Sequence, residues 1–278
     1  MDMNSPRVGL IGLGLMGAPV ARNLLQAGVR LTCNDLDASA VAVAVEQGAT
    51  AAATAAEVAA DSDVILVIVP TNEDAREVVA GSDGVLSTAR PGSVVVLCSS
   101  LRPDTCAELE ERAREAGVHL IDAPMTGGIR GAEQGTMTLL VGGDVAALQR
   151  ARPALELISS TIHHLGGIGA GQVGKTVNNL IHWGEVVVIT EALALGAKLG
   201  VDVSRMRRAL MDASVDSRTL RELEKMKFTW HAKDLEDAMD MAATVGHRMP
   251  AAEMSREEML SITPERVARL LADEDWDA

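Results

Sequence analysis

Apolar and polar positions alternate in blocks through the first half of the chain. Short apolar runs that predict strands lie at 7–13, 30–34, 63–69, 93–98, 118–121 and 137–142. Segments with helical periodicity separate them, at 16–27, 36–47, 54–60, 72–80 and 103–116, and the alanine-rich stretch 49–60 fits a further strand and helix. Strands that are apolar throughout require a parallel sheet covered on both faces. The alternation therefore predicts an α/β fold with a doubly wound parallel sheet.

The pattern changes after Gly166 and Gly167, where the strand-like runs stop. Residues 171–199 form one long apolar segment, and helical periodicity continues beyond it. We therefore predict an α/β domain over 1–166 and an all-helical domain over 167–278, joined by a long shared helix. The β-branched run 186–189 forms helix poorly, so tertiary burial must stabilise it there. Because so long an apolar helix is difficult to bury in one small domain, a homodimer or homotetramer is expected.

Glycines interrupt the first apolar run with the spacing G-x-G-x-x-G. The first glycine allows a tight turn, the second lets the backbone approach a pyrophosphate, and the third lets strand and helix pack closely. The helix that follows directs its N–H groups at phosphates. A carboxylate at the end of the next strand can bind a ribose diol. The domain over 1–166 is therefore predicted to be a Rossmann dinucleotide-binding domain, with cofactor contacts from Gly12, Gly14, Leu15, Met16, Gly17 and Asp35.

The surroundings of Asp35 favour NAD over NADP. The segment 33–37 holds two acids and no base. A carboxylate repels a 2′-phosphate and can hydrogen-bond a free 2′-hydroxyl. Pro70 and Ser100 follow two further strands, and because the carboxyl ends of parallel strands border the ligand crevice, we expect both residues near the cofactor. Helix capping is an equally good account of the serine.

Thr126, Gly127 and Gly128 follow the strand at 118–121. A hydroxyl followed by two glycines exposes consecutive backbone N–H groups, which can surround a carboxylate without adding a full charge. The segment is thus a candidate substrate-binding loop. A tight turn without a ligand is the alternative.

Lys175 and Asn179 share one face of the long predicted helix, and His182 continues the same stripe. A lysine in an otherwise apolar helix is costly to bury without a partner or a task. Its amino group can exchange a proton with a substrate oxygen, which Asn179 can orient. Alternatively, the lysine stem lies on the surface while its amino group reaches water. For His182, a structural role is favoured.

Other charged or ligand-type residues are less informative. Lys233 begins a later helical segment, either as a solvated helix start or as a side chain that reaches the cofactor. His163 and His164 lack the spacing and acidic neighbours of a metal site, so no metal is expected, and we predict a polar turn there.

Composition excludes several classes of partner. The net charge of −14 argues against nucleic acid and anionic membranes. No segment is expected to be long enough to span a bilayer. The three cysteines, Cys33, Cys98 and Cys106, are sparse and lack metal-site spacing. They predict a reduced, disulfide-free and cytoplasmic protein.

Four blocks in order resemble the β-hydroxyacid dehydrogenase family, which includes 3-hydroxyisobutyrate dehydrogenases and tartronate semialdehyde reductases. The blocks are 12–17, with the family's Met inside the glycine signature, 122–143, 171–179 and 233–235. The resemblance implies a catalytic Lys175, an assisting Asn179, a carboxylate-binding loop at 126–128 and nicotinamide contacts from Lys233 and from the chain near Pro70 or Ser100. Thr126 stands where serine is usual, Met125 where valine is common, and the segment after Pro250 is shorter and more charged. The resemblance therefore leaves the particular substrate open.

The resulting expectation is an NAD-dependent oxidoreductase that acts on a small 3-hydroxy acid and gives the semialdehyde or 3-oxo acid. An imine reductase on the same fold and a non-catalytic nucleotide-binding scaffold are the alternatives. Retention of Lys175 and Asn179 speaks against both.

Overall fold

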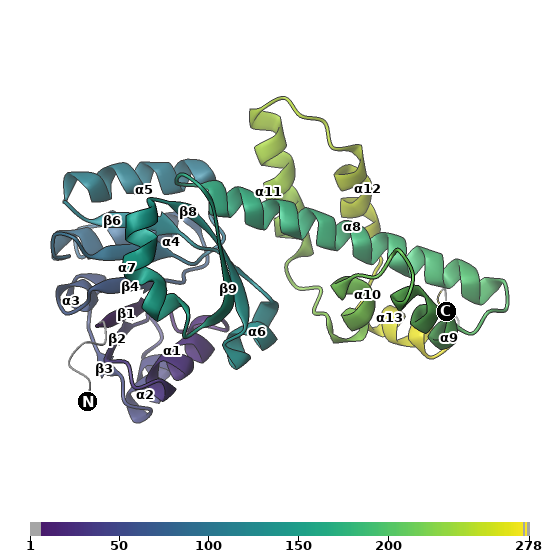
Figure 1. The fold of residues 1–278 in the computed structure, drawn as a ribbon, viewed down its shortest axis with the longest axis horizontal. Coiled ribbons are helices and arrows are strands. Elements are labelled where there is room, and N and C mark those ends of the chain that lie inside the picture. Colours follow the sequence, from purple (N-terminus) through teal and green to yellow (C-terminus); the bar gives the residue numbers. More distant parts are fainter. Residues whose placement is uncertain (1–6, 275, 277–278) are drawn as a thin grey trace. The chain divides into compact units, whose positions relative to one another are not determined.

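The chain divides into two compact units, of which the first ends at Lys175 and the second begins at Thr176. The computed structural model describes residues 7–274 and residue 276 (Figure 1). The sequence-based boundary between residues 166 and 167 lies just before the long helix α8 (Ala170–Lys198), whereas the compact units divide within it.

The first unit is built on a sheet whose first six strands are all parallel. Its spatial order is β3-β2-β1-β4-β5-β6, so the chain starts in the middle, moves to one edge and returns to build the other half. This is the doubly wound topology expected from the apolar pattern. The strands are β1 (Val8–Ile11), β2 (Leu31–Asn34), β3 (Thr50–Ala51), β4 (Val64–Val67), β5 (Val94–Leu97) and β6 (His119–Asp122).

The remaining strands extend the doubly wound parallel part into a mixed sheet at one edge. Strand β8 (Met137–Gly143) runs antiparallel to β6 and to the short β7 (Met125–Thr126), and β9 (Ser159–Gly166) runs parallel to β8. Neighbouring parallel strands need a crossover helix, which α7 (Val145–Leu155) provides between β8 and β9. His163 and His164 lie in β9, so the predicted polar turn is wrong. His164 Nε2 lies 2.8 Å from the carbonyl oxygen of Gly143.

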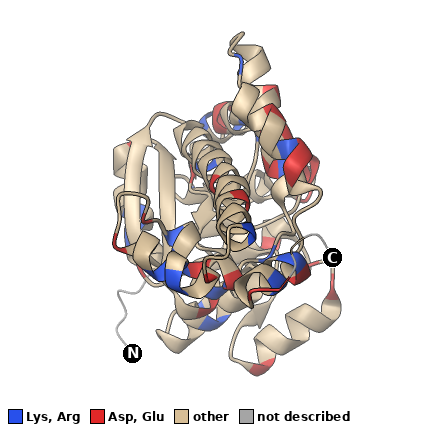
Figure 2. Ribbon diagram, turned by 90° about the vertical axis from the view of Figure 1, so that its right-hand side faces the viewer, with Lys and Arg blue, Asp and Glu red and all other residues tan. Residues whose placement is uncertain are grey.

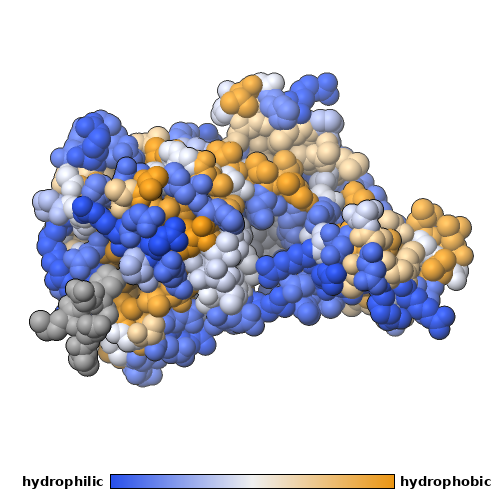
Figure 3. Space-filling view, in the orientation of Figure 1, coloured by the Kyte–Doolittle hydropathy of each residue, from blue (hydrophilic) through white to orange (hydrophobic). Residues whose placement is uncertain are grey.

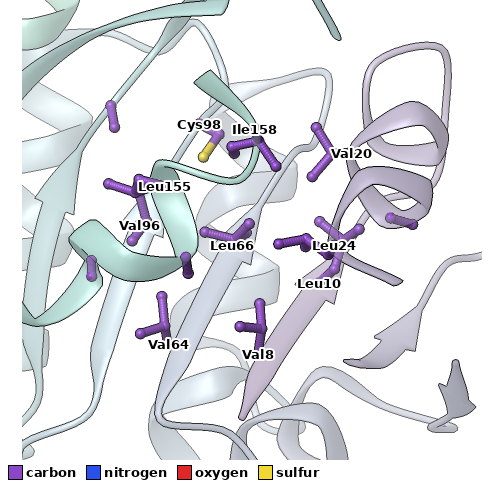
Figure 4. Close-up of a cluster of buried hydrophobic side chains, with 14 of the residues drawn as sticks. Val8, Leu10, Val20, Leu24, Val64, Leu66, Val96, Cys98, Leu155 and Ile158 are labelled. Atoms are coloured by element: carbon purple, nitrogen blue, oxygen red, sulfur yellow. The ribbon is translucent and has the colours of Figure 1, made fainter. Parts of the chain in front are cut away.

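Both faces of the parallel strands are buried, because successive side chains point to opposite sides. Leu10, Leu66 and Val96 belong to one hydrophobic cluster, with residues of α1 and α7 (Figure 4). The alternating positions Ile65, Val67, Val95 and Leu97 belong to the other cluster, with residues of α3, α4 and α5. The helices of this unit, besides α7, are α1 (Gly17–Gln26), α2 (Ala38–Glu46), α3 (Ala55–Ala60), α4 (Asn72–Ala80), α5 (Pro103–Glu115), α6 (Gly128–Gln134) and the 3₁₀ turn η1 (Val85–Ser87).

The second unit is helical throughout its described residues, as predicted. Val186 and Val187 of α8 are fully buried in its core, so tertiary packing does stabilise the β-branched run. Leu235 and Leu270 come from later helices of the same core. Those helices are α9 (Val203–Met211), α10 (Arg218–Glu222), α11 (His231–Thr244), α12 (Pro250–Met259) and α13 (Pro264–Leu271), with the 3₁₀ turn η2 (Leu223–Lys225).

Helix α8 overturns the expectation that no segment is long enough to span a bilayer. It has 29 residues, and its most apolar stretch of 18 residues has a mean hydropathy of 1.4, with 33% of that stretch buried. Its only Lys, Arg, Asp or Glu residues are Lys175, Glu185, Glu191 and Lys198, and the helix is mostly tan in Figure 2. Because part of its surface packs in the core of the second unit, length and composition alone do not make it a membrane span.

Candidate active site

The glycine loop between β1 and α1 leaves open space at one position only. Gly12 has a φ of +95°, and a Cβ there would lie 2.0 Å from the carbonyl oxygen of Ile68. A Cβ on Gly17 would lie 1.9 Å from the carbonyl oxygen of Gly12. At Gly14, by contrast, a Cβ would meet no described atom within 4 Å. The first and third glycines are therefore required by packing, whereas the second leaves the open backbone that a pyrophosphate needs. The loop thus fits a dinucleotide.

Asp35 is fixed beside this loop by two backbone groups. The N–H of Leu13 donates to its Oδ2 at 2.5 Å, and the N–H of Asp37 donates to its Oδ1 at 2.8 Å. A carboxylate oxygen can accept more than one hydrogen bond, so Asp35 retains acceptor capacity for a ribose diol. The next side chain, Leu36, is fully exposed at the same strand end.

A buried carboxylate, Asp122 at the end of β6, caps the first turn of α8. Its Oδ1 accepts from the N–H of Gly169 at 2.7 Å, and its Oδ2 accepts from the N–H of Gln172 at 2.8 Å. Burial raises the pKa of Asp122, and these backbone donors oppose that effect. The cap joins the carboxyl end of β6 to the helix that carries Lys175. Sequence reasoning gave Asp122 no role.

The predicted carboxylate-binding segment is the junction between β7 and α6. Thr126 Oγ1 donates to the carbonyl oxygen of Thr138 at 3.2 Å. Gly127 and Gly128 have φ angles of +113° and +63°, which other residues rarely adopt. The first N–H groups of a helix have no acceptor within it, so the start of α6 presents backbone donors here.

Lys175 is half-buried in the second turn of α8, and Asn179 follows it by one turn with 8% exposure. Asn178 Nδ2 donates to Asn179 Oδ1 at 3.0 Å. His182 Nδ1 lies 3.1 Å from Thr219 Oγ1, and the ring packs against Trp183 with centroids 4.6 Å apart. These contacts give His182 a structural role within the second unit.

Lys233 lies exposed near the start of α11 and forms an ion pair with Asp237 at 2.9 Å. The next two residues of the same motif hold the helix in place. Asp234 Oδ2 accepts from Trp183 Nε1 at 3.0 Å, and Leu235 is fully buried. A cofactor contact from Lys233 stays a prediction.

Topology brings most predicted site residues to one edge of the sheet. The glycine loop follows β1, Asp35 follows β2, the exposed Pro70 follows β4 and the half-buried Ser100 follows β5. Thr126 comes shortly after β6. All five strands are parallel, so these positions lie beyond the same carboxyl edge, where doubly wound sheets bind ligands. Asn179 and Lys233 belong to the second unit.

Comparisons with known proteins agree with this arrangement. Residues 7–189 match the family described as the NAD-binding domain of 6-phosphogluconate dehydrogenase, and residues 169–275 match the NAD-binding domain of NADP-dependent 3-hydroxyisobutyrate dehydrogenase. The chain is 40% identical over 210 residues to 2-(hydroxymethyl)glutarate dehydrogenase from Eubacterium barkeri, across 76% of this chain and 70% of that protein. It belongs to the β-hydroxyacid dehydrogenase family.

Two further β-hydroxyacid dehydrogenases are similar to it. NAD-dependent L-serine dehydrogenase from Pseudomonas aeruginosa is 38% identical over 75% of this chain and 70% of its own. The structure of 3-hydroxyisobutyrate dehydrogenase from Mycobacterium tuberculosis with L-serine superposes with a TM-score of 0.83 at 28% identity, covering 99% of this chain and 97% of that one. The protein is accordingly an oxidoreductase with a nicotinamide cofactor, NAD or NADP, which sets aside the non-catalytic scaffold.

Proposed function

We propose that the protein oxidises a small 3-hydroxy acid to the semialdehyde or 3-oxo acid, with NAD as the preferred cofactor. The observation that carries this proposal is the buried Asp122 cap. It attaches the helix of Lys175 to the strand that leads into the Thr126-Gly127-Gly128 loop. The proposed proton acceptor, the proposed carboxylate-binding loop and the glycine loop are thus all attached to the carboxyl edge of one sheet, which supports the proposed arrangement.

In the proposed reaction, neutral Lys175 accepts the proton of the substrate hydroxyl at Nζ, while the carbon loses a hydride. The bound nicotinamide supplies the hydride acceptor. Asn179 donates its side-chain N–H to the same oxygen and orients it. Backbone N–H groups of Gly127 and Gly128 hold the carboxylate, and the Thr126 hydroxyl joins them by turning its proton from the Thr138 carbonyl oxygen to the substrate. In the reductive direction Lys175 returns the proton.

The substrate class follows from what the relatives' names have in common. Serine, 3-hydroxyisobutyrate and 2-(hydroxymethyl)glutarate each carry a primary hydroxyl on the carbon next to the one that bears the carboxylate. The third group on that central carbon differs, being amino, methyl or carboxyethyl. We propose that this chain oxidises the primary hydroxyl of acids that share this arrangement of hydroxyl and carboxylate. A panel that varies the third group, together with imines as the alternative class, identifies the substrate through nicotinamide absorbance.

The role of Lys175 is tested by Lys175→Ala, with Lys198→Ala at the far end of the same helix as the matched control. We expect kcat/KM to fall by ~10²–10⁴-fold, as is typical when proton-transfer help is lost. The dissociation constant for NAD, measured by calorimetry, should stay close to that of the unmodified protein. Near-normal turnover of Lys175→Ala would refute the assignment.

The preference for NAD is tested by Asp35→Asn, with the exposed Asp83→Asn as a control of equal charge change. Removing the negative charge should reduce the ratio of kcat/KM for NAD to that for NADP by about tenfold, or ~1.4 kcal/mol. An unchanged ratio would show that Asp35 does not select the cofactor.

We also propose that the protein is a cytoplasmic homo-oligomer. The three cysteines are buried free thiols, which suits a reducing compartment. Exposed apolar residues follow α8 at intervals of seven, namely Ile181, Val188 and Leu195. Figure 3 shows apolar surface, in orange, among hydrophilic residues on one face of the molecule. Such a stripe favours burial against a second copy of the helix.

A further inference from the structure

Gln172 lies at the centre of a buried polar cluster that joins the first turn of α8 to two neighbouring strand ends. The side chain is 1% exposed. Its Oε1 accepts from the N–H of Leu101, and its Nε2 donates to the carbonyl oxygen of Ser99, both at 2.9 Å. Its own backbone N–H donates to Asp122 Oδ2. One residue therefore links α8 to the segment after β5 and to the end of β6.

This link depends on hydrogen bonding and not only on size. The amide presents one acceptor to Leu101 and one donor to Ser99, so only one orientation satisfies both backbone groups. An apolar side chain of the same length satisfies neither. A buried polar group left unpaired costs ~1–3 kcal/mol, so the local backbone would shift to find other partners.

Close packing around Asp122 leaves the first turn of α8 little room to move. A Cβ on Gly171 would lie 2.3 Å from the carbonyl oxygen of Leu140 and 2.6 Å from Asp122 Oδ2. A Cβ on Gly142 would lie 2.4 Å from Asp122 Oδ1. The backbone at Gly142 and Gly171 therefore lies closer to the Asp122 carboxylate than a residue with a side chain would allow. The orientation of the first turn is set by these contacts together with Gln172.

We infer that Gln172 is a positioning residue that holds Lys175 and Ser100 in a fixed relation to each other. Lys175 follows Gln172 by three positions on the same helix, and Ser100 lies between the two backbone groups that Gln172 binds. Replacing the Gln172 amide should therefore displace both Lys175, the proposed proton-transferring residue, and Ser100, which is predicted to lie near the nicotinamide. The inference rests on the proposed role of Lys175.

The proposal is tested by Gln172→Met and Gln172→Glu, with Gln149→Met and Gln149→Glu on the exposed side of α7 as matched controls. In Gln172→Met we expect kcat to fall by about 10–100-fold at every pH, with a smaller change in KM, because displacement of a reacting group by ~1 Å costs as much as 10²-fold. The Gln149 variants should behave like the unmodified protein.

The glutamate variant separates hydrogen bonding from packing. A protonated carboxyl donates to Ser99 and accepts from Leu101, whereas the ionised form can only accept. Two titratable groups contact Gln172, namely Asp122 on β6 and Cys106 on α5, and burial raises the pKa of both. A carboxyl at position 172 should likewise keep its proton to a higher pH than usual. The deficit in kcat of Gln172→Glu should therefore shrink as the pH falls, while that of Gln172→Met should not.

A second measurement needs neither cofactor nor turnover. In the cofactor-free protein, the rate at which acetic anhydride acetylates Lys175 is followed against pH by peptide mass spectrometry. We expect the acetylation profile of Lys175 to shift in Gln172→Met, and to shift in Gln172→Glu over the pH range in which the carboxylate at position 172 is ionised. Unchanged kcat and an unchanged Lys175 titration in both variants would overturn the inference, as would losses without recovery at low pH. Absence of hydroxy-acid turnover in the unmodified protein would instead refute the proposed function, and the acetylation profile would still decide the role of Gln172.

Discussion

Gly12 and Gly14, two positions apart in one loop, are required for different physical reasons. A side chain at position 12 would collide with the backbone of Ile68 and would also have to adopt a positive φ. A side chain at position 14 would meet open space, which the pyrophosphate of the cofactor would occupy. We therefore expect the first glycine to contribute to stability and the second to cofactor binding.

Alanine at position 14 should mainly weaken NAD binding, whereas alanine at position 12 should mainly lower the free energy of unfolding. Gly14→Ala should change the free energy of unfolding by no more than about 0.5 kcal/mol, as for an open surface position. It should raise the dissociation constant for NAD by about tenfold or more. Gly12→Ala should destabilise the protein by several kcal/mol through its backbone collision. Chemical denaturation and calorimetry of the same samples measure both quantities. Equal destabilisation by the two substitutions would contradict this division.

Single residues also show where sequence reasoning stops. The proximity of the glycine loop and Asp35 could be predicted because both belong to one βαβ unit. Asp122 and Gln172 could not, since the hydrogen bond between them joins positions 50 residues apart. The signal of Asp122 in the sequence is a polar side chain at the end of a mostly apolar strand, and that of Gln172 is a polar side chain in the apolar segment that forms α8. Such a signal shows that a partner is needed without showing which one.

Among the elements, strands with a mainly apolar sequence were predictable, whereas the largely exposed β9 was not. β4 and β5 are buried at every position, so their sequences carry no polar residue. β9 exposes Ser160, His163 and His164, and it is stabilised by pairing with β8 rather than by an apolar run. Its parallel pairing depends on tertiary structure, which a local pattern does not contain.

The start of α11 should make the second unit sensitive to acid. His231 packs edge-on against Trp183 of α8 with ring centroids 6.0 Å apart, and its Nδ1 is buried without a hydrogen-bond partner among the described residues. Burial lowers the pKa of His231, and Asp234 partly opposes this. Folding therefore favours the neutral ring. The neutral His231 ring stabilises the fold fully above the ordinary histidine pKa of about 6.5. This stabilisation is lost as the pH falls through that value towards the lowered pKa of the folded protein.

Replacing His231 should remove this dependence on pH. In His231→Gln, the decrease in Tm between pH 8 and pH 5 should be smaller than in the unmodified protein, because the unfolded chain no longer gains a proton at this position. His247→Gln, at an exposed histidine beyond the end of the same helix, is the matched control. Parallel Tm profiles for His231→Gln and the unmodified protein would exclude His231 as the acid-sensitive group.

At the scale of the whole molecule, the exposed stripe on α8 predicts self-association. Ile181, Val188 and Leu195 are 58%, 57% and 61% exposed, although Val186 and Val187 beside them are fully buried. A helix with one apolar side in its own core and another facing solvent is suited to pack against a second helix. A twofold arrangement would bring the same residue of both copies into the interface.

A charge in the middle of the stripe should therefore separate the copies. Light scattering coupled to size exclusion should give a multiple of 29.1 kDa for the unmodified protein and a mass shifted towards 29.1 kDa for Val188→Glu. The dissociation constant should rise by about a hundredfold or more, since each ~1.4 kcal/mol is tenfold and every interface would bury a glutamate from each copy. Val215→Glu, at a turn position with 56% exposure outside α8, should keep the mass of the unmodified protein. If the unmodified protein were monomeric, or if Val188→Glu retained the oligomer mass, the α8 stripe would not be the interface. The two glutamate variants carry the same charge change at nearly equal exposure, so a difference between them assigns the effect to position on the helix.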